Sequence, residues 1–534
     1  MAAAVAAIVY AYRPRRAGEA VAPLGGGLGM ALAAPIAVWT IGGLEQPFVA
    51  AFLAWATVLS FPLIDEPASS WRDALAPSFL LGLLCLTRAD GGVLCMALAL
   101  GIATVRGITG DTAKLISGLA AFPALMGGGQ LIFRLVYYHE WLPNPARVKV
   151  AFTPERLMEG LLYLGDAVPY LGVLMIPAVA AIFVGLVGRG RSRRTSMLGV
   201  QLIAWLAYVA IIGGDIFPAR RHWVPALVIA AMLVADLTQW LSRQGGTARL
   251  AAWVGTGMML VLLVATQQID PEAERAVQER WEWDGQDVGE LLRQAFGAAD
   301  PLIACDPAGC IPYFTKFRAI DMMGLNDYHI ARQRPPEFGR RALGHELGDG
   351  KYVLDREPDL VLWSIPTGSN WPVSPSAVQM AQDPRFARNY RLVFLATIAP
   401  GRKAPVYCGL WLRVHSDRIG MRWEDGRLIL PGVLAASGLD RPATIDPQGR
   451  LGVLARVETP GQMKGMLLPP GRWRVTAESD VPVRIRLRAS DKVVEGVGEL
   501  LLDAGRDAPG LTVDLELTPA STPAAHVRRV VLSP

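Results

Sequence analysis

Apolar runs long enough to cross a lipid bilayer recur through the first half of the chain, from Met1 to about Thr266, with short polar breaks between them. A membrane-spanning helix needs about 20 predominantly apolar residues, and the bilayer core admits only helices and closed barrels. The first half is therefore predicted to be a polytopic α-helical membrane domain. Its nine candidate spans are residues 24–39, 44–62, 74–87, 90–106, 114–137, 167–187, 196–213, 222–241 and 248–266. Because 74–87 and 90–106 are short, a broken or re-entrant pair around Arg88 and Asp90 is an open alternative.

Arginines of this half gather in the short loops 13–20, 189–194 and 242–249. Basic loops stay on the cytoplasmic side of a membrane, and counting the spans alternately puts all three loops on that side. The net charge of +5 is thus explained by topology rather than by a nucleic-acid partner. The opposite side receives loops 42–46, 88–90, 139–166 and 213–221, together with everything after residue 268. We therefore expect a multi-pass plasma-membrane protein whose polar loops and C-terminal half are extracytoplasmic.

The opening run, residues 1–12, is apolar, short and followed by a basic loop. It is typical of the inner end of a spanning helix whose outer part is missing. A short interfacial helix is the alternative, but the Ala, Val and Ile composition of the run leaves no polar face. We therefore expect a partial first helix and an N-terminal truncation.

After about residue 270 the chain has the sequence of a water-soluble protein. An amphipathic helix is expected at 287–298, with strands near 301–305, 317–321, 351–354 and 358–363, and this mixture predicts a small α/β domain. Alternating strands at 472–477, 483–488 and 511–517, broken by Pro, Gly and Asp turns, predict a β-sandwich. The expected domains are 1–268 (transmembrane), 269–420 (outward-facing α/β) and 421–534 (β-sandwich).

The chain has five cysteines. Cys85 and Cys95 lie in apolar segments and are interpreted as small core residues. Cys305 and Cys310 have a spacing that fits no zinc pattern. A disulfide between them in an oxidising compartment and two free thiols both remain open.

The segment 212–222, Ile-Gly-Gly-Asp-Ile-Phe-Pro-Ala-Arg-Arg-His, is the strongest candidate for chemistry. Ionisable residues at the edge of a bilayer are expensive and mark functional sites by default. Two glycines let a backbone or ligand approach Asp215, while Arg220, Arg221 and His222 place positive charge at the start of the next helix. A carboxylate beside arginines at a membrane rim suits a lipid-linked phosphate. The alternative is a polar turn with arginines that extend toward water.

Three further polar groups lie in the loops of the same side. Arg88 and Asp90, in Thr87-Arg-Ala-Asp-Gly, are first expected to pair with each other. Glu45 begins a helix and can simply favour its dipole. Asn144 and Lys149 belong to an aromatic and basic loop of a kind that is common at interfaces without any catalytic role.

Taken in order, these motifs resemble a known family. They are Gly43-Leu-Glu, Thr87-Arg-Ala-Asp-Gly, Leu142-Pro-Asn with Lys149, Gly213-Gly-Asp with Arg220-Arg221, and the stretch from Asp306-Pro-Ala-Gly-Cys to Ile320-Asp-Met-Met-Gly-Leu-Asn-Asp. Over roughly residues 25–365 the chain resembles polyprenyl-phosphate-dependent glycosyltransferases of the GT-C superfold. The likeness is greatest to actinobacterial terminal arabinofuranosyltransferase-like membrane proteins.

The resemblance implies transfer of a sugar, such as arabinofuranose or another pentose or a hexose, from a polyprenyl-phosphate donor to a cell-envelope glycan. It makes Asp215 a candidate catalytic carboxylate in a supporting role, and Arg220 and Arg221 candidates for binding the lipid phosphate. The remaining candidates for substrate binding are Arg88, Asp90, Glu45, Asn144 and Lys149. In this superfold the principal carboxylate usually lies in the first outward loop, and this sequence has no such loop. Asp90 also stands where the family more often has Glu, and Pro145-Ala146 where a Thr/aromatic pair is usual.

Two other function classes remain open. A catalytically inactive homologue would serve as a membrane scaffold or glycan-binding protein, and a transporter is disfavoured because matching broken helices are not evident. Glycan binding by the β-sandwich would use exposed tryptophans such as Trp473, for which a place in the core is the alternative. The sequence establishes no cofactor, and a divalent cation at the carboxylates is left open.

Overall fold

The computed structural model describes residues 1–534 except 67–68, 188–191, 399, 490–491 and 504–510. The chain forms two compact units. The first comprises Met1–Pro143 and Val150–Glu279, and the second comprises Asn144–Lys149 and Arg280–Pro534. A short piece of the membrane half therefore belongs to the unit built by the C-terminal half.

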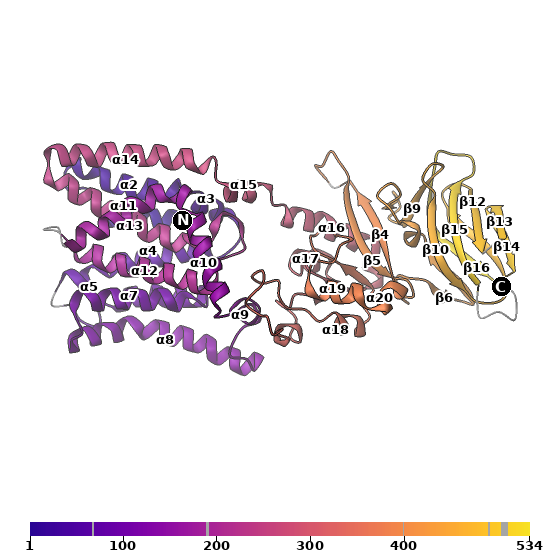
Figure 1. The fold of residues 1–534 in the computed structure, drawn as a ribbon, viewed down its shortest axis with the longest axis horizontal. Helices are drawn as coiled ribbons and strands as arrows, with labels where there is room; N and C mark the ends of the chain where they lie inside the picture. The colour runs from indigo at the N-terminus through magenta and orange to yellow at the C-terminus, as the bar shows by residue number, and fades with distance from the viewer. Residues whose placement is uncertain (67–68, 188–191, 399, 490–491, 504–510) are drawn as a thin grey trace. The chain divides into compact units, whose positions relative to one another are not determined.

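The first unit is entirely helical in its described elements (indigo to magenta in Figure 1). Its α-helices are α1 (Ala2–Ala11), α2 (Val21–Ala31), α3 (Ala34–Ile41), α4 (Gln46–Leu59), α5 (Phe61–Asp65), α6 (Leu75–Thr87), α7 (Gly91–Arg106), α8 (Gly110–Tyr138), α10 (Pro154–Asp166), α11 (Val168–Val187), α12 (Arg193–Ile212), α13 (Trp223–Gln244), α14 (Gly246–Gln267) and α15 (Pro271–Gln278). Two 3₁₀ turns, η1 (Ala17–Ala20) and η2 (Pro218–Arg220), complete it.

Six helical stretches among the described residues are long and apolar enough to cross a membrane. They are Gln46–Asp65, Gly110–Tyr138, Val168–Leu186, Arg193–Ile212, Trp223–Gln244 and Gly246–Gln267. The chain is thus a multi-pass membrane protein by length and composition. The pair Ala17–Ala31 and Ala34–Ile41 qualifies only together and is bent by 60°, at a break just before Pro35 in the first turn of α3. All nine expected segments contain helix, but α6 and α7 are short, so nine complete crossings remain a prediction.

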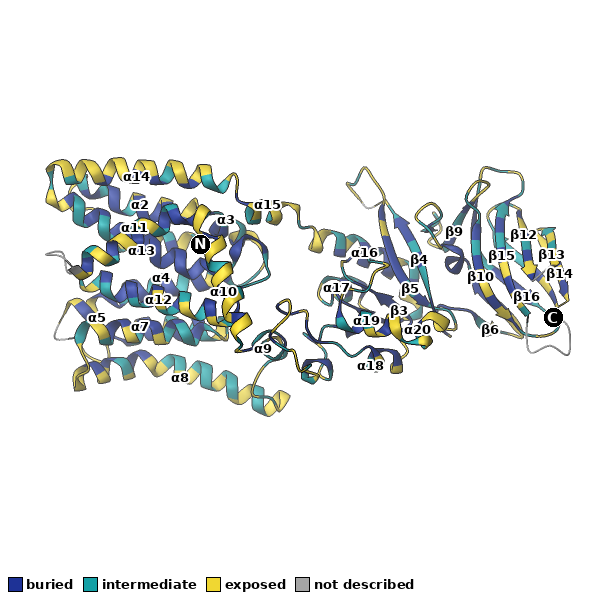
Figure 2. Cartoon of the chain, in the orientation of Figure 1, coloured by how far each residue is buried: buried dark blue, intermediate teal, exposed yellow. Residues whose placement is uncertain are grey.

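Helix α13 forms the centre of this unit. Of its most apolar window 78% is buried, compared with 22% for α14 and 17% for α8, which expose long faces in Figure 2. A helix that is apolar all round and buried on most sides is typical of a bundle core. The residues at the two ends of α13 therefore lie where the loops of its neighbours converge.

One end of the bundle gathers basic loops. The Arg243 guanidinium, in the last turn of α13, lies 3.6 Å from the Glu19 carboxylate in η1, and Arg194 at the start of α12 pairs with Asp65 at 2.6 Å. The expectation that loops 13–20 and 242–249 share an end with the start of α12 is confirmed. Arg189 and Arg191 lie outside the described residues. The cytoplasmic assignment of this end remains a prediction.

The second unit combines short helices with many strands (rose to yellow in Figure 1, apart from the purple α9). Its α-helices are α9 (Asn144–Lys149), α16 (Trp281–Phe296), α17 (Cys310–Thr315), α18 (Gly350–Asp355), α19 (Pro375–Gln382) and α20 (Pro384–Asn389), with 3₁₀ turns η3 (Gly297–Ala299), η4 (Ile330–Arg332) and η5 (Gly432–Ala435). Its strands are β1 (Leu302–Cys305), β2 (Arg318–Asp321), β3 (Leu360–Leu362), β4 (Tyr390–Thr397), β5 (Val406–Arg413), β6 (Arg422–Glu424), β7 (Arg427–Pro431), β8 (Ala443–Ile445), β9 (Leu451–Arg456), β10 (Gly461–Leu468), β11 (Arg472–Ser479), β12 (Val483–Ala489), β13 (Lys492–Val497), β14 (Glu499–Asp503), β15 (Leu511–Pro519) and β16 (Ala524–Ser533).

The α/β part is a mixed sheet in the order β2-β1-β3-β5-β4. Strand β1 runs parallel to β2 and β3, whereas β5 is antiparallel to β3 and β4. Three of the four strands expected here are present. The fourth, at 351–354, is wrong, because that run lies in helix α18. The Asp349 side chain caps α18 by accepting a hydrogen bond from the Tyr352 backbone N–H at 3.0 Å, and a local cap of this kind overrides the strand preference of a short apolar run.

The strand-rich end of the unit contains two sheets. The larger one continues from β4 through a single paired position, Leu395 with Ala443, into β8-β9-β16-β11-β14. A four-stranded antiparallel sheet, β10-β15-β12-β13, forms the second layer. Buried side chains of both sheets, including Val475 and Leu515, belong to one apolar cluster. The strand-rich C-terminal half that the sequence predicts is therefore confirmed.

Asp306 is a buried carboxyl group at the end of β1. Its side chain accepts a hydrogen bond from the Ser364 backbone N–H at 2.7 Å, and the residue is 3% exposed. Burial raises the pKa of Asp306 to about 6, because a charged carboxylate is disfavoured away from water. The neighbouring Cys305 is buried, and all five cysteines, Cys310 included, are free thiols.

We expect ionisation of the Asp306 carboxyl group to lower the free energy of unfolding as the pH rises from about 4 to 6. Its pKa is raised from the ordinary 3.8 to about 6, so the folded state retains the proton longer than the unfolded state. The stabilising contribution of the neutral form is present below pH 4 and is lost above pH 6, a change of about 3 kcal/mol. Proteolysis of the unfolded fraction of the full chain at each pH measures it. Asp306→Asn should be less sensitive to pH than the wild type, and identical profiles would contradict this account.

Trp473 lies in the core of the strand-rich end. It is 7% exposed, and its indole Nε1–H donates a hydrogen bond to the Pro469 carbonyl at 3.0 Å. The neighbouring Trp423 is 55% exposed, with ring centroids 5.9 Å apart. The structure thus favours the core interpretation of Trp473 over a glycan-binding one.

Truncating Trp473 to Ala should destabilise the second unit by about 3 kcal/mol or more, because a large cavity opens in the core. The matched control Trp423→Ala removes an exposed ring and should change the stability by less than about 1 kcal/mol. Pulse proteolysis of the full chain in urea measures both changes. Equal stability of the two variants would argue that Trp473 is not a core residue.

Candidate functional site

Arg88 organises a charged group at the junction of α6 and α7. Its guanidinium donates to both Asp90 carboxylate oxygens at 2.7 Å and forms a further ion pair with Glu45. The Tyr208 hydroxyl, on α12, adds a hydrogen bond to Asp90 at 3.3 Å. The expected pairing of Arg88 with Asp90 is therefore confirmed, and Glu45 joins it.

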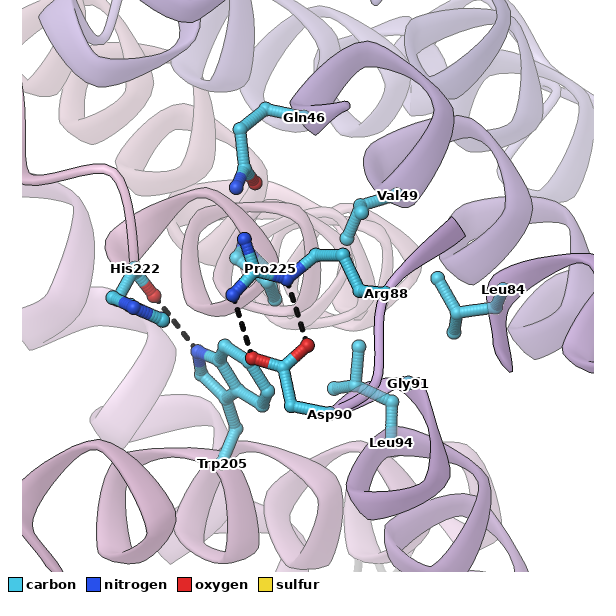
Figure 3. Close-up of a pocket in the computed structure, with 10 residues that line it drawn as sticks. All are labelled: Gln46, Val49, Leu84, Arg88, Asp90, Gly91, Leu94, Trp205, His222 and Pro225. Carbon is cyan, nitrogen blue, oxygen red and sulfur yellow. Dashed lines mark hydrogen bonds and ion pairs between the residues drawn. The ribbon is translucent and has the colours of Figure 1, made fainter. Parts of the chain in front are cut away.

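Figure 3 shows the recess around this group. Its lining comes from five helices, α4, α6, α7, α12 and α13, and from the loops before α7 and α13, namely Gln46, Val49, Leu84, Arg88, Asp90, Gly91, Leu94, Trp205, His222 and Pro225. The Trp205 indole N–H donates to the His222 carbonyl at 2.8 Å and closes one side. The recess is too narrow to hold a water molecule. Within the recess Arg88 pairs with Asp90, whereas the Gln46 Oε1 atom is buried without a hydrogen-bond partner among the described residues.

Asp215 and Arg221 form a second charged pair beside the recess. The Asp215 carboxylate accepts hydrogen bonds from Arg221 Nε at 2.8 Å, from Arg221 Nη2 at 3.1 Å and from the Ile216 backbone N–H at 3.0 Å. Its side chain is 4% exposed. The Arg221 guanidinium also lies over the Phe217 ring, 4.4 Å from its centroid. This fork-like pairing fixes the orientation of both side chains.

The local backbone conformation requires glycine at the two positions before Asp215. Gly213 and Gly214 have φ of +87° and +77° and end α12, since the Gly214 N–H donates to the Val209 carbonyl at 3.0 Å. A Cβ atom on Gly214 would lie 2.7 Å from the Cβ of Tyr163. The sequence predicts a close approach here, and the group that makes it is the Tyr163 side chain.

His222 lies between the two charged pairs. Its Nε2 atom is 4.0 Å from Asp215 Oδ2, and the residue also lines the recess with Arg88 and Asp90. The His222 side chain is 7% exposed and contributes a buried ring to this end of the bundle. That His222 adds positive charge to the start of α13 stays a prediction.

Arg220 belongs to a separate buried cluster. Its Nη1 atom lies 2.6 Å from both carboxylate oxygens of Asp270, and its Nη2 atom lies 2.6 Å from Asp166. The Arg220 and Asp270 side chains are 2% and 1% exposed. Both Ala219 and Arg220 have positive φ, of 50° and 49°, a backbone conformation that costs non-glycine residues energy. The ion pairs hold this strained turn in place.

Removing the Arg220 side chain should lower the unfolding temperature of the first unit. Arg220→Ala leaves the buried Asp270 carboxylate without its cation, which costs about 3–5 kcal/mol. The matched control is Arg243→Ala, at the other end of α13, whose side chain is 50% exposed and which should cost less than about 1 kcal/mol. Thermal unfolding of the purified chain in detergent measures both. Equal unfolding temperatures would rule out the structural role of this cluster.

Asn144 and Lys149 lie on α9, in the second unit. The Asn144 amide donates to the Asp327 carbonyl and accepts from Arg332 Nη1, both at 3.4 Å. Val148 is fully buried in an apolar cluster with Ile330. The structure thus brings Glu45, Arg88, Asp90, Asp215 and Arg221 to one end of the helical unit and places Asn144 and Lys149 in the other unit.

Several residues of this end were not expected from the sequence. Tyr163, Asp166, Tyr208 and Asp270 all contact candidate residues. Only Asp270 carries a sequence signal, since it directly follows the last long apolar run. Within the described residues, no group of three or more His, Cys, Asp or Glu side chains could hold a metal ion. A divalent cation remains a hypothesis.

Residues 268–412 match a family model described as "Domain of unknown function (DUF8728)". No curated protein matches the chain. Among solved structures, the crystal structure of ArnT from Cupriavidus metallidurans in the apo state is similar at 13% identity and a TM-score of 0.36, covering 60% of this chain and 69% of that chain. A similarity at this level does not establish a shared fold.

Proposed function

We propose that the chain is a GT-C-like membrane glycosyltransferase. In this proposal it transfers a sugar, such as arabinofuranose, from a polyprenyl-phosphate donor to a cell-envelope glycan on the outer face of the membrane. The observation that carries the proposal is the convergence of two arginine–carboxylate groups at one end of the apolar bundle. Arg88 with Asp90 and Glu45, and Arg221 with Asp215, come from loops far apart in the sequence.

The transfer reaction needs a positively charged group for the departing phosphate and a negatively charged group for the acceptor hydroxyl. When the sugar leaves the carrier, the polyprenyl phosphate departs with the electron pair of the C–O bond, and a nearby cation stabilises its charge. Arginine suits this role because its planar fork binds phosphate oxygens in pairs. The acceptor hydroxyl must lose a proton, which a carboxylate can accept.

Arg221 and Asp215 are assigned complementary roles in this proposal. Arg221 binds Asp215 through Nε and Nη2, whereas no described residue forms a hydrogen bond with its Nη1 atom. A donor phosphate that takes over part of this guanidinium would release Asp215 to orient or deprotonate the acceptor. Arg220 is assigned a structural role, because two carboxylates already balance its charge.

A second candidate function is an inactive homologue that acts as a scaffold or glycan-binding protein. One observation favours it. The Asp90 and Asp215 carboxylates are both paired with arginines, and the recess beside them does not admit water. A substrate would have to open this end of the bundle before any transfer. An assay for transfer separates the two functions.

In an assay with a panel of radiolabelled polyprenyl-phosphate sugars, Asp215→Asn and Arg221→Ala should each lower turnover about 10²-fold or more. Both variants remove charges proposed to act on the donor or acceptor. Arg243→Ala, at the opposite end of α13, should keep the wild-type rate.

Two results would count against the proposal. If the wild type transfers no sugar from any donor, the scaffold function gains support. If both site variants turn over at the wild-type rate, the Asp215–Arg221 pair is not part of the site.

A further inference from the structure

We propose that the second unit contains a binding site for a compact phosphate monoester, independent of the proposed lipid-phosphate site. The site is a cavity of about 180 Å³ next to the C-terminal end of α16. Arg418, Arg422 and Arg528 contribute to its wall. Apolar side chains, including Phe296, Val433 and Leu451, form much of the rest.

Two of these arginines have partners within the protein. Arg418 donates a hydrogen bond to the Asp300 carbonyl, and its Nε atom lies 3.9 Å from the Asp359 carboxylate. Arg422 pairs with Glu424, and its Nη1 atom donates to the Gly420 carbonyl at 3.2 Å. These contacts hold the two guanidinium groups in place beside the cavity.

Arg528 is different. Among the described residues, no carboxylate lies within 4.0 Å of its guanidinium, whereas the adjacent Arg529 pairs with Glu478 at 2.8 Å. The cavity wall thus includes a guanidinium group that no carboxylate of the described residues neutralises, and this points to a ligand that supplies acceptor oxygens.

The size and lining of the cavity define the class of ligand. Sites for drug-sized molecules usually measure about 300–1,000 Å³, so this cavity suits a smaller molecule. Three arginines favour an oxyanion, and phosphate matches their planar donor geometry. The apolar wall suits the carbon skeleton that carries the phosphate. Glycerol phosphate is a probe with these properties.

Isothermal titration calorimetry of the full chain in detergent tests the proposal. Glycerol phosphate is the probe and glycerol is the neutral control. The wild type should bind glycerol phosphate, and not glycerol. Arg528→Gln should weaken binding about tenfold or more, because a charged donor is lost. The matched control Arg472→Gln, on β11 with a side chain 82% exposed, should bind like the wild type.

The unfolding temperature of each variant without ligand shows whether its fold is intact. If Arg528→Gln does not fold, Arg422→Gln is compared in its place and should show the same loss. No binding to the wild type at millimolar glycerol phosphate would overturn the proposal. Equal binding by the wild type and a folded cavity variant would overturn it as well. Sugar transfer by the membrane unit does not enter this measurement.

Discussion

The need to neutralise charge at the end of an apolar helical bundle governs the first unit. Each buried ion costs several kcal/mol to remove from water unless another charge compensates it. The groups that meet this need include Arg88 with Asp90 and Glu45, Arg221 with Asp215, and Arg220 with Asp166 and Asp270. The pairs of Arg88 with Glu45 and of Arg220 with Asp166 and Asp270 connect distant parts of the sequence. They therefore fix how the helices meet at that end.

The three groups differ in how their charges are balanced. Arg220 faces two carboxylates and supports a strained turn, which makes it a structural element. Arg221 faces one carboxylate and keeps one nitrogen without a hydrogen bond from the described residues, which leaves it able to exchange partners. His222 lies beside Asp215 as a buried ring. A site that has to bind phosphate and then release it needs an exchangeable arginine rather than a fully neutralised one.

Local patterns in the sequence predicted the parts of this arrangement that depend on short spacing. The pairing of Arg88 with Asp90 follows from their separation by one residue. The partners of Arg220 are 54 and 50 residues away, so no local pattern could identify them. The burial of a side chain in the folded protein also has no signal in a local sequence pattern. It places Trp473 in the core, and a helix cap converts the expected strand at 351–354 into α18.

The central claim is that the Asp215–Arg221 end of the bundle binds the phosphate of a lipid carrier. Photo-crosslinking tests it most directly, with a polyprenyl-phosphate analogue that carries a diazirine next to the phosphate, followed by mass spectrometry of the labelled peptides. The account predicts labelling in residues 88–91 and 213–222, with competition by the unlabelled lipid phosphate. Labelling confined to the basic end, around residues 13–20 and 242–249, would contradict it.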